Sequence, residues 1–154
     1  MRRILPAILT LLMVATAVPA AEKGAESHGR TGAQNYYVDA TDMSQVPRLV
    51  RKILVRAVAA ARRGEHPEAI GELQEHLREH PDQDHFLLRY HLARSHDEQQ
   101  QYEAAQREYR RAVEMEPRLS EAWFGLGHVA YNLEDYAGSG EAFLKAFRTS
   151  ADPQ

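Results

Sequence analysis

The chain has 154 residues, of which 44% are hydrophobic and 27% charged, and its formal net charge at pH 7 is −3. It contains no cysteine, which excludes structural disulfides, thiolate metal sites, cysteine nucleophiles and lipid-modified cysteine anchors. The length allows one ordinary domain, and the slightly acidic balance gives no general attraction for nucleic acid, which usually binds to a basic surface.

The first twenty residues have the pattern of an export signal. Residues 1–3 are a short basic start, residues 4–18 are almost all apolar, and residues 18–20 are small, as a signal peptidase requires. The apolar stretch is shorter than the roughly 20 residues of a spanning helix, and Pro6 interrupts it, although an uncleaved anchor is the alternative. We therefore expect a cleavable signal peptide at 1–20, a periplasmic or secreted protein, and no stable membrane anchor after cleavage.

Residues 21–43 are rich in Gly, Ala, Ser, Thr and isolated charges, without apolar periodicity. This composition is typical of a flexible linker. Tyr36, Tyr37 and Val38 are the exception, because three large side chains in a row need a surface to contact. We expect them to pack on the folded domain or on a partner.

From Ser44 onward the hydrophobic pattern is helical throughout. Helix starts are indicated by Ser44 with Pro47, by Pro67 after the break at Gly64, by Asp84 and by Ser120. The pattern predicts six helices, at about 46–63, 67–79, 85–98, 102–115, 120–133 and 136–149.

Prolines and aromatic residues of this helical region recur at a nearly fixed interval. Pro81 and Pro117 are 36 residues apart, and Tyr109 and Phe143 are 34 apart. A unit of this length is one supersecondary element that cannot bury its own apolar face, so neighbouring units must stack to form a shared core.

These residues resemble the tetratricopeptide repeat, a helix-turn-helix unit of 34 residues. The unit at 86–119 carries the family's motif in order: Leu92-Ala93, Tyr102, Ala105, Tyr109, Ala112 and Pro117. The unit at 120–153 has Trp123, Leu126-Gly127, Tyr136, Ser139, Phe143 and Ala146, with its closing proline displaced to Pro153. The unit at about 50–85 fits at Ala57, Gly64, Ala69, Leu73 and Pro81, but has His66 at the turn aromatic and His76 at a small-residue position.

The resemblance implies an all-α fold, a right-handed α-solenoid of three helix-turn-helix units in a domain at 44–150. The small residues of the motif, such as Ala57, Ala93 and Gly127, let neighbouring helix axes approach to about 8 Å. Larger side chains such as Trp123 and Phe143 then fill the space between successive helices.

The resemblance also implies a concave groove that binds a polypeptide. Its expected residues are Leu54, Val58, Arg62, Tyr90, His91, Arg94, Asp97, Phe124, His128, Tyr131 and Asn132. Aromatic and Arg side chains suit peptide recognition, although Tyr90 and Tyr131 would alternatively pack between helices. The family's clamp for acidic chaperone tails needs Lys, Asn and Arg, and its positions here hold Leu54, Val58, His91, Glu121 and Gly125, so we expect no chaperone tail as ligand.

The function expected from this resemblance is a non-enzymatic adaptor or scaffold of the bacterial cell envelope, without a cofactor. One alternative is weak metal binding by His76, His80 and His85, since His76 to His80 reads H-x-x-E-H, a string also found in zinc proteases. No distant acidic ligand completes such a protease site. No Ser-His-Asp constellation or nucleotide-binding glycine loop is evident either.

The two ends of the array carry further signals. Arg48, Lys52 and Arg56 form one basic helical stripe, which could steer an acidic partner or lipid headgroups, or simply be a solvated face. At the other end, Gly138 and Gly140 weaken the last helix by about 1 kcal/mol each relative to Ala, and Leu144 and Phe147 lack a following helix. We expect this end to dimerise, to dock on a partner or to fray. Besides metal binding, the alternative function is therefore a structural subunit that self-associates, as a homodimer through the C-terminal helix.

Overall fold

The computed structural model describes residues 43–151, and the predicted signal peptide and nearly all of the predicted linker lie outside the described residues. Among residues 43–151 there are six α-helices, two short 3-10 helices and no strand. The elements are η2 (Met43–Gln45), α1 (Arg48–Arg62), α2 (His66–Glu79), η3 (Pro81–Gln83), α3 (Phe86–Glu98), α4 (Tyr102–Met115), α5 (Ser120–Asn132) and α6 (Tyr136–Ala151). None of these helices is long and apolar enough to cross a membrane.

The predicted all-α fold of three helix-turn-helix units is confirmed, and every helix end lies within two residues of its predicted position. The predicted helix starts need two corrections. Pro47, not Ser44, is the N-cap of α1. His85, not Asp84, is the N-cap of α3, because its Nδ1 accepts a hydrogen bond of 3.2 Å from the backbone N–H of Leu87.

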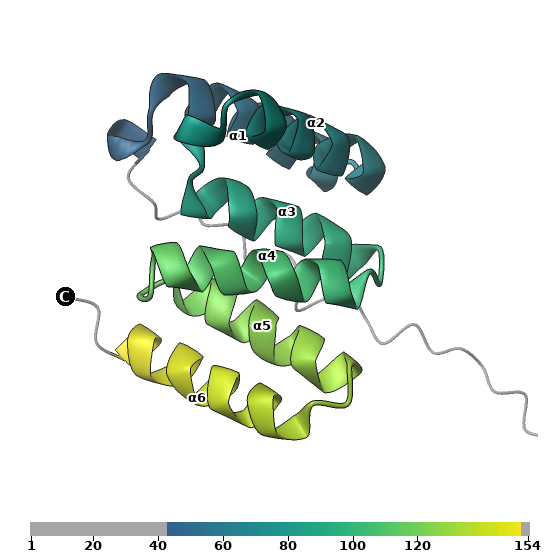
Figure 1. Cartoon of the computed structure of the whole chain (residues 1–154), viewed down its shortest axis with the longest axis vertical. Helices are drawn as coiled ribbons and strands as arrows, with labels where there is room; N and C mark the ends of the chain where they lie inside the picture. The colour runs from purple at the N-terminus through teal and green to yellow at the C-terminus, as the bar shows by residue number, and fades with distance from the viewer. Residues whose placement is uncertain (1–42, 152–154) are drawn as a thin grey trace, which may run out of the picture. The chain divides into compact units, whose positions relative to one another are not determined.

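The helices stack in chain order, so that each packs against the one before it (Figure 1). Two groups of buried side chains hold the stack together. One joins α1, α2 and α3 through residues such as Val50, Leu73 and Leu88. The other joins α3, α4, α5 and α6 through residues such as Tyr109 and Val129. The core is therefore continuous along the stack, because α3 contributes to both groups.

The three helix pairs close with the same turn. Gly64, Gln100 and Glu134 have positive φ angles of 82°, 57° and 61°, each just after the first helix of its pair. The next residue in each turn donates a backbone hydrogen bond of 2.9–3.0 Å to a carbonyl five residues earlier, which satisfies a helix-end acceptor. Only the first unit uses the glycine that this backbone conformation favours.

Small residues set the separation of the last helix pair. A Cβ on Gly127 would lie 2.8 Å from Cδ1 of Phe143, and the hydroxyl of Ser139 donates a 2.8 Å hydrogen bond to the carbonyl oxygen of Gly127. The predicted role of Gly127 as a close-approach residue is confirmed by this contact.

A buried ion network fixes α3 against α4. The Arg89 side chain is 11% exposed, and its guanidinium donates to both Asp84 carboxylate oxygens, at 2.7 and 2.5 Å, and to Glu108 at 2.7 Å. Hydrogen bonds with these carboxylates raise the pKa of Arg89 above its ordinary value. Asp84 therefore positions Arg89, which explains why it does not cap α3.

Candidate functional site: the face formed by the first helices

All of the predicted groove residues lie on the first helices of the three pairs, α1, α3 and α5. Two of them are not accessible. Leu54 is 3% exposed and Tyr90 is 1% exposed, and both belong to the core. The Tyr90 ring lies 6.2 Å from that of Tyr109 on α4. The prediction that these two residues contact a ligand is corrected by their burial, and the alternative that Tyr90 packs between helices holds.

A small recess gathers three of the predicted residues from α1 and α3. Val58, His91 and Arg94 line it together with residues of α2. Burial, and next the charges of Arg94 and Arg62, lower the pKa of His91 to about 3. His91 is therefore neutral at physiological pH and offers one donor and one acceptor beside two cationic side chains.

A polar pair connects the second unit to the third. Nδ1 of His128 on α5 lies 3.1 Å from a carboxylate oxygen of Asp97 on α3, and the Asn132 amide donates a 2.9 Å hydrogen bond to the His128 carbonyl oxygen. The hydrogen bond with Asp97 raises the pKa of His128, and the charges of Asp97 and Glu98 add to this, although burial opposes them. The His128 side chain is 52% exposed, so it remains open to a ligand.

The other two aromatic residues of the predicted groove, Phe124 and Tyr131, lie on α5, toward the C-terminal end. Phe124 is 43% exposed and its ring centroid lies 5.2 Å from that of Phe143 on α6. Tyr131 is 61% exposed and lies 5.5 Å from Tyr136 in an edge-to-face pair. Both rings pair with an α6 aromatic side chain and still keep an exposed face.

Apart from Phe124, the accessible predicted residues form one surface, which we name the first-helix face. Its members are Val58, Arg62, His91, Arg94, Asp97, His128, Tyr131 and Asn132. It combines cationic, neutral imidazole, carboxylate, amide and phenol groups. Such a surface can hydrogen-bond a polypeptide backbone and contact its side chains.

The histidines of the predicted metal alternative are not gathered into a site. His76 is 4% exposed and its ring centroid lies 5.0 Å from that of His80, while Nδ1 of His85 caps α3. In the part of the chain that the structure describes, no group of three or more His, Cys, Asp or Glu residues could hold a metal ion. The metal alternative therefore gains no support from the described residues.

The basic stripe on α1 is partly neutralised. Arg56 forms an ion pair with Glu72 of α2, while Arg48 and Lys52 are exposed.

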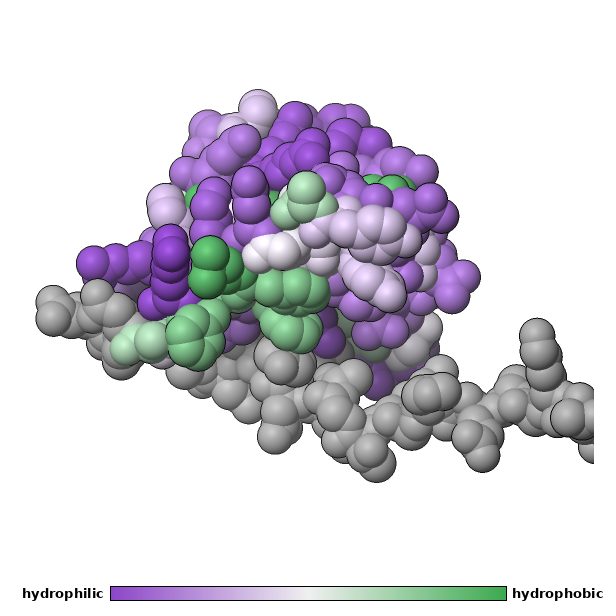
Figure 2. Space-filling model, turned by 90° about the horizontal axis from the view of Figure 1, so that it is seen from below, coloured by the Kyte–Doolittle hydropathy of each residue, from purple (hydrophilic) through white to green (hydrophobic). Residues whose placement is uncertain are grey.

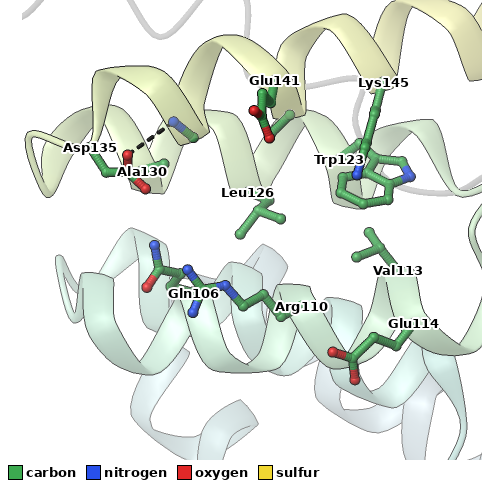
Figure 3. Close-up of a pocket in the computed structure, with 12 residues that line it drawn as sticks. Gln106, Arg110, Val113, Glu114, Trp123, Leu126, Ala130, Asp135, Glu141 and Lys145 are labelled. Carbon is green, nitrogen blue, oxygen red and sulfur yellow. Dashed lines mark hydrogen bonds between the residues drawn. The ribbon is translucent and has the colours of Figure 1, made fainter.

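Sequence reasoning missed a recess on the side of the second helices. It has a volume of about 270 Å³ and lies between α4 and α6, with α5 as its floor (Figure 3). Leu126 and Trp123 form the floor, Arg110 lies on the α4 side, and Lys145 of α6 lies 4.3 Å from the Trp123 ring centroid. Trp123 was expected only to fill space between helices. Residue spacing does not give the separation of α4 and α6, so it does not reveal a recess between them.

Comparison with known proteins agrees with this geometry. The sequence profile of the tetratricopeptide repeat matches residues 26–84 and 90–153. Among solved structures, the chain is similar to the tetratricopeptide domain of Sgt2 from Aspergillus fumigatus, with a TM-score of 0.63 and 24% identity over 69% of each chain. It is also similar to the second tetratricopeptide domain of Spaghetti (RPAP3) bound to the HSP90 peptide SRMEEVD, with a TM-score of 0.60 and 18% identity over 64% of this chain and 90% of that one.

No curated protein matches the chain. The profile nevertheless covers well over half of its residues, and the described helices have the arrangement of the two structural neighbours. The chain belongs to the tetratricopeptide repeat family, whose members are generally non-enzymatic interaction modules.

Proposed function

We propose that this protein is a non-enzymatic adaptor of the bacterial cell envelope that binds a polypeptide segment on its first-helix face. The observation that carries the proposal is the Asp97–His128 pair, which connects the faces of α3 and α5 at 3.1 Å. Together with Arg94 and His91 it makes one polar surface across successive units, as an extended ligand requires.

The envelope location is supported by the sequence of residues 1–20, whose basic start, apolar stretch and small residues suit export. Cell fractionation with N-terminal sequencing of the recovered protein tests it. We expect recovery in the periplasmic or secreted fraction, with a new N-terminus near Ala21. Recovery in the cytoplasm with Met1 or Arg2 at the N-terminus would contradict the envelope location and leave polypeptide binding to be tested separately.

The binding proposal is tested by selecting peptides from a random displayed library against the full chain. Selected peptides should lose at least about tenfold in affinity on His128→Ala and on Arg94→Ala, because each replacement removes a polar group at the centre of the face. Arg107→Ala is the matched control, since Arg107 is exposed on α4. Peptides that bind all four proteins equally well would show that the first-helix face is not the binding site.

The same assay separates this protein from chaperone-tail readers. The structural neighbour RPAP3 carries the HSP90 peptide SRMEEVD. Here the clamp positions include the buried Leu54, the neutral His91 and Gly125, where an added Cβ would lie 2.3 Å from Cζ of Tyr109. We expect no measurable binding of SRMEEVD, and micromolar binding would overturn this expectation.

A further inference from the structure

The third unit exposes a surface whose equivalent in the second unit is buried. Tyr90, Tyr109 and Val113 of the second unit are 1%, 2% and 5% exposed. Their counterparts 34 residues later are Phe124, which is 43% exposed, Phe143, which is partly buried, and Phe147, which is 70% exposed. The difference arises because α5 covers the second unit, whereas no described helix packs over the outer side of α5 and α6.

The outer side of α6 is apolar along most of its length. Gly140, Leu144, Phe147 and Ala151 recur at intervals of four, three and four residues, which places them on one side of the helix. Leu144 is 48% exposed. Figure 2 looks at this end of the stack and shows hydrophobic residues gathered on a face that is otherwise largely hydrophilic. A terminal repeat that faces only water normally has a polar outer side, so this surface, which we name the terminal face, is suited to a partner.

The first helix of a second copy does not suit this surface. The outward side of α1 carries exposed Arg48 and Lys52, and α6 itself presents Lys145 and Arg148. A head-to-tail contact would therefore bring like charges together and place cations over Leu144 and Phe147.

The α6 helix is instead complementary to itself when two copies run antiparallel. Glu141 and Arg148 are seven residues apart, so they lie on nearly the same side of α6, beside the apolar residues. A two-fold axis next to Leu144 brings Glu141 of each copy level with Arg148 of the other, because both lie about 5 Å from that axis along the helix. Neither side chain forms an ion pair within the described residues.

The same axis matches a large residue to a small one. The Phe147 ring of one copy then lies near Gly140 of the other. A Cβ on Gly140 would have nothing within 4 Å, so the space over this glycine is open in the single chain. An antiparallel two-fold contact thus buries the apolar residues and pairs the charges at once.

We propose that the terminal face binds the terminal face of a second copy, through antiparallel α6 helices, with Phe147 packing near Leu144 and Gly140 and with two Glu141–Arg148 ion pairs. One helix pair buries less than the roughly 800 Å² per partner of a standard interface, so the dimer is weak and forms at high local concentration. The first-helix face stays open on both copies, so dimerisation and peptide binding are independent.

Sedimentation velocity of the chain as recovered from cells, from about 1 µM to 1 mM, tests the proposal. We expect a concentration-dependent shift from monomer to dimer that Phe147→Glu abolishes. Arg148→Glu should weaken the dimer at least about fivefold, because it sets two pairs of carboxylates against each other. The double variant Glu141→Arg with Arg148→Glu should restore it, and Arg107→Glu is the matched control. A monomer at every concentration overturns the proposal, and so does a dimer that the charge exchange does not restore.

A second readout uses the absence of cysteine in the chain. Leu144→Cys should form a disulfide-linked dimer under mild oxidation, because facing Cα atoms of two close antiparallel helices lie within disulfide range. Val55→Cys, at a 62% exposed position of α1, should not. Efficient cross-linking only through Val55→Cys would show that the copies meet through α1. The affinity of a peptide for the first-helix face is measured separately on the monomer and on the dimer. Equal affinities show that the adaptor function is intact, so a failure to dimerise is distinguished from a failure of the proposed adaptor function.

Discussion

Gly125 of α5 lies against the ring of Tyr109 on α4 so closely that a Cβ at position 125 would be 2.3 Å from Cζ of the tyrosine. The equivalent positions one unit earlier, on α2 and α3, hold different residues. There Leu73 takes the place of the tyrosine and His91 that of the glycine, and both border the same small recess. At the α4–α5 interface the ring of Tyr109 therefore limits the size of the residue at position 125.

Gly125→Ala should destabilise the protein by about 2 kcal/mol, although alanine favours helices, because the added methyl group forces the buried Tyr109 ring to move. Urea unfolding followed by circular dichroism measures the change. Gly71→Ala is the matched control, since Gly71 is an exposed helical glycine whose added Cβ would meet nothing within 4 Å. It should stabilise the protein by about 0.5–1 kcal/mol, and equal effects of the two substitutions would contradict the close contact.

The turns of the second and third units offer a second prediction. Gln100 and Glu134 have positive φ angles of 57° and 61°, which cost a residue with a side chain about 1 kcal/mol. Gln100→Gly and Glu134→Gly should therefore each raise the free energy of unfolding by about 0.5–1 kcal/mol, despite the greater entropy of glycine in the unfolded chain. The converse variant Gly64→Ala should lower it, since Gly64 has a φ of 82°. A loss of stability in both glycine variants would argue against this turn geometry.

The helices could be predicted from the sequence because their signals are local and recur. Proline, the small residues of the motif and the aromatic positions repeat every 34 or 36 residues, and helix ends follow from this spacing. The pairing of Asp97 with His128 could not be predicted in the same way, since it depends on the rotation of α3 relative to α5. The spacing places both residues on the first-helix face but gives no distance between them.

Burial was the weaker part of the site prediction. Leu54, Tyr90 and Phe124 occupy equivalent positions in the three units, yet their exposed fractions are 3%, 1% and 43%. The equivalence is visible in the sequence, but whether a residue is covered depends on whether another described helix packs over it. Treating the three positions alike therefore assigned two core residues to the groove.

The two glycines of α6 are predicted to differ sharply. The Asp135 carboxylate accepts a 2.9 Å hydrogen bond from the backbone N–H of Gly138, and a Cβ there would lie 2.3 Å from the other carboxylate oxygen. Gly138→Ala gains helix propensity but displaces this cap, so its net effect should lie between zero and a loss of about 1 kcal/mol.

Gly140→Ala should instead stabilise α6 by about 0.5–1 kcal/mol, because the added Cβ meets nothing within 4 Å. Thermal unfolding at low micromolar concentration, where self-association does not contribute, measures both variants. Asp135→Ala combined with Gly138→Ala gives the decisive comparison. Once the carboxylate is gone, Gly138→Ala should stabilise the protein as Gly140→Ala does, and a remaining penalty would show that the Asp135 side chain is not its cause.

The contact of His128 with Asp97 predicts a pH dependence of stability with a definite sign. The hydrogen bond with Asp97 raises the pKa of His128 above its ordinary value of 6.5, so the folded state binds the proton more tightly than the unfolded state. The stabilisation is fully present below pH 6.5 and is lost as the pH rises through the folded-state pKa. Because the His128 side chain is 52% exposed, solvent limits the contribution to at most about 1 kcal/mol.

Chemical unfolding of wild type and of His128→Asn between pH 5 and 9 isolates this contribution. The free energy difference between the two proteins should be largest at the acidic end and should decline above pH 6.5. Asp97→Asn should abolish the decline, since it removes the charge that stabilises the imidazolium. An NMR titration of the His128 ring protons gives the folded-state pKa directly, and a value at or below 6.5 in the wild type would contradict the contact between the two side chains.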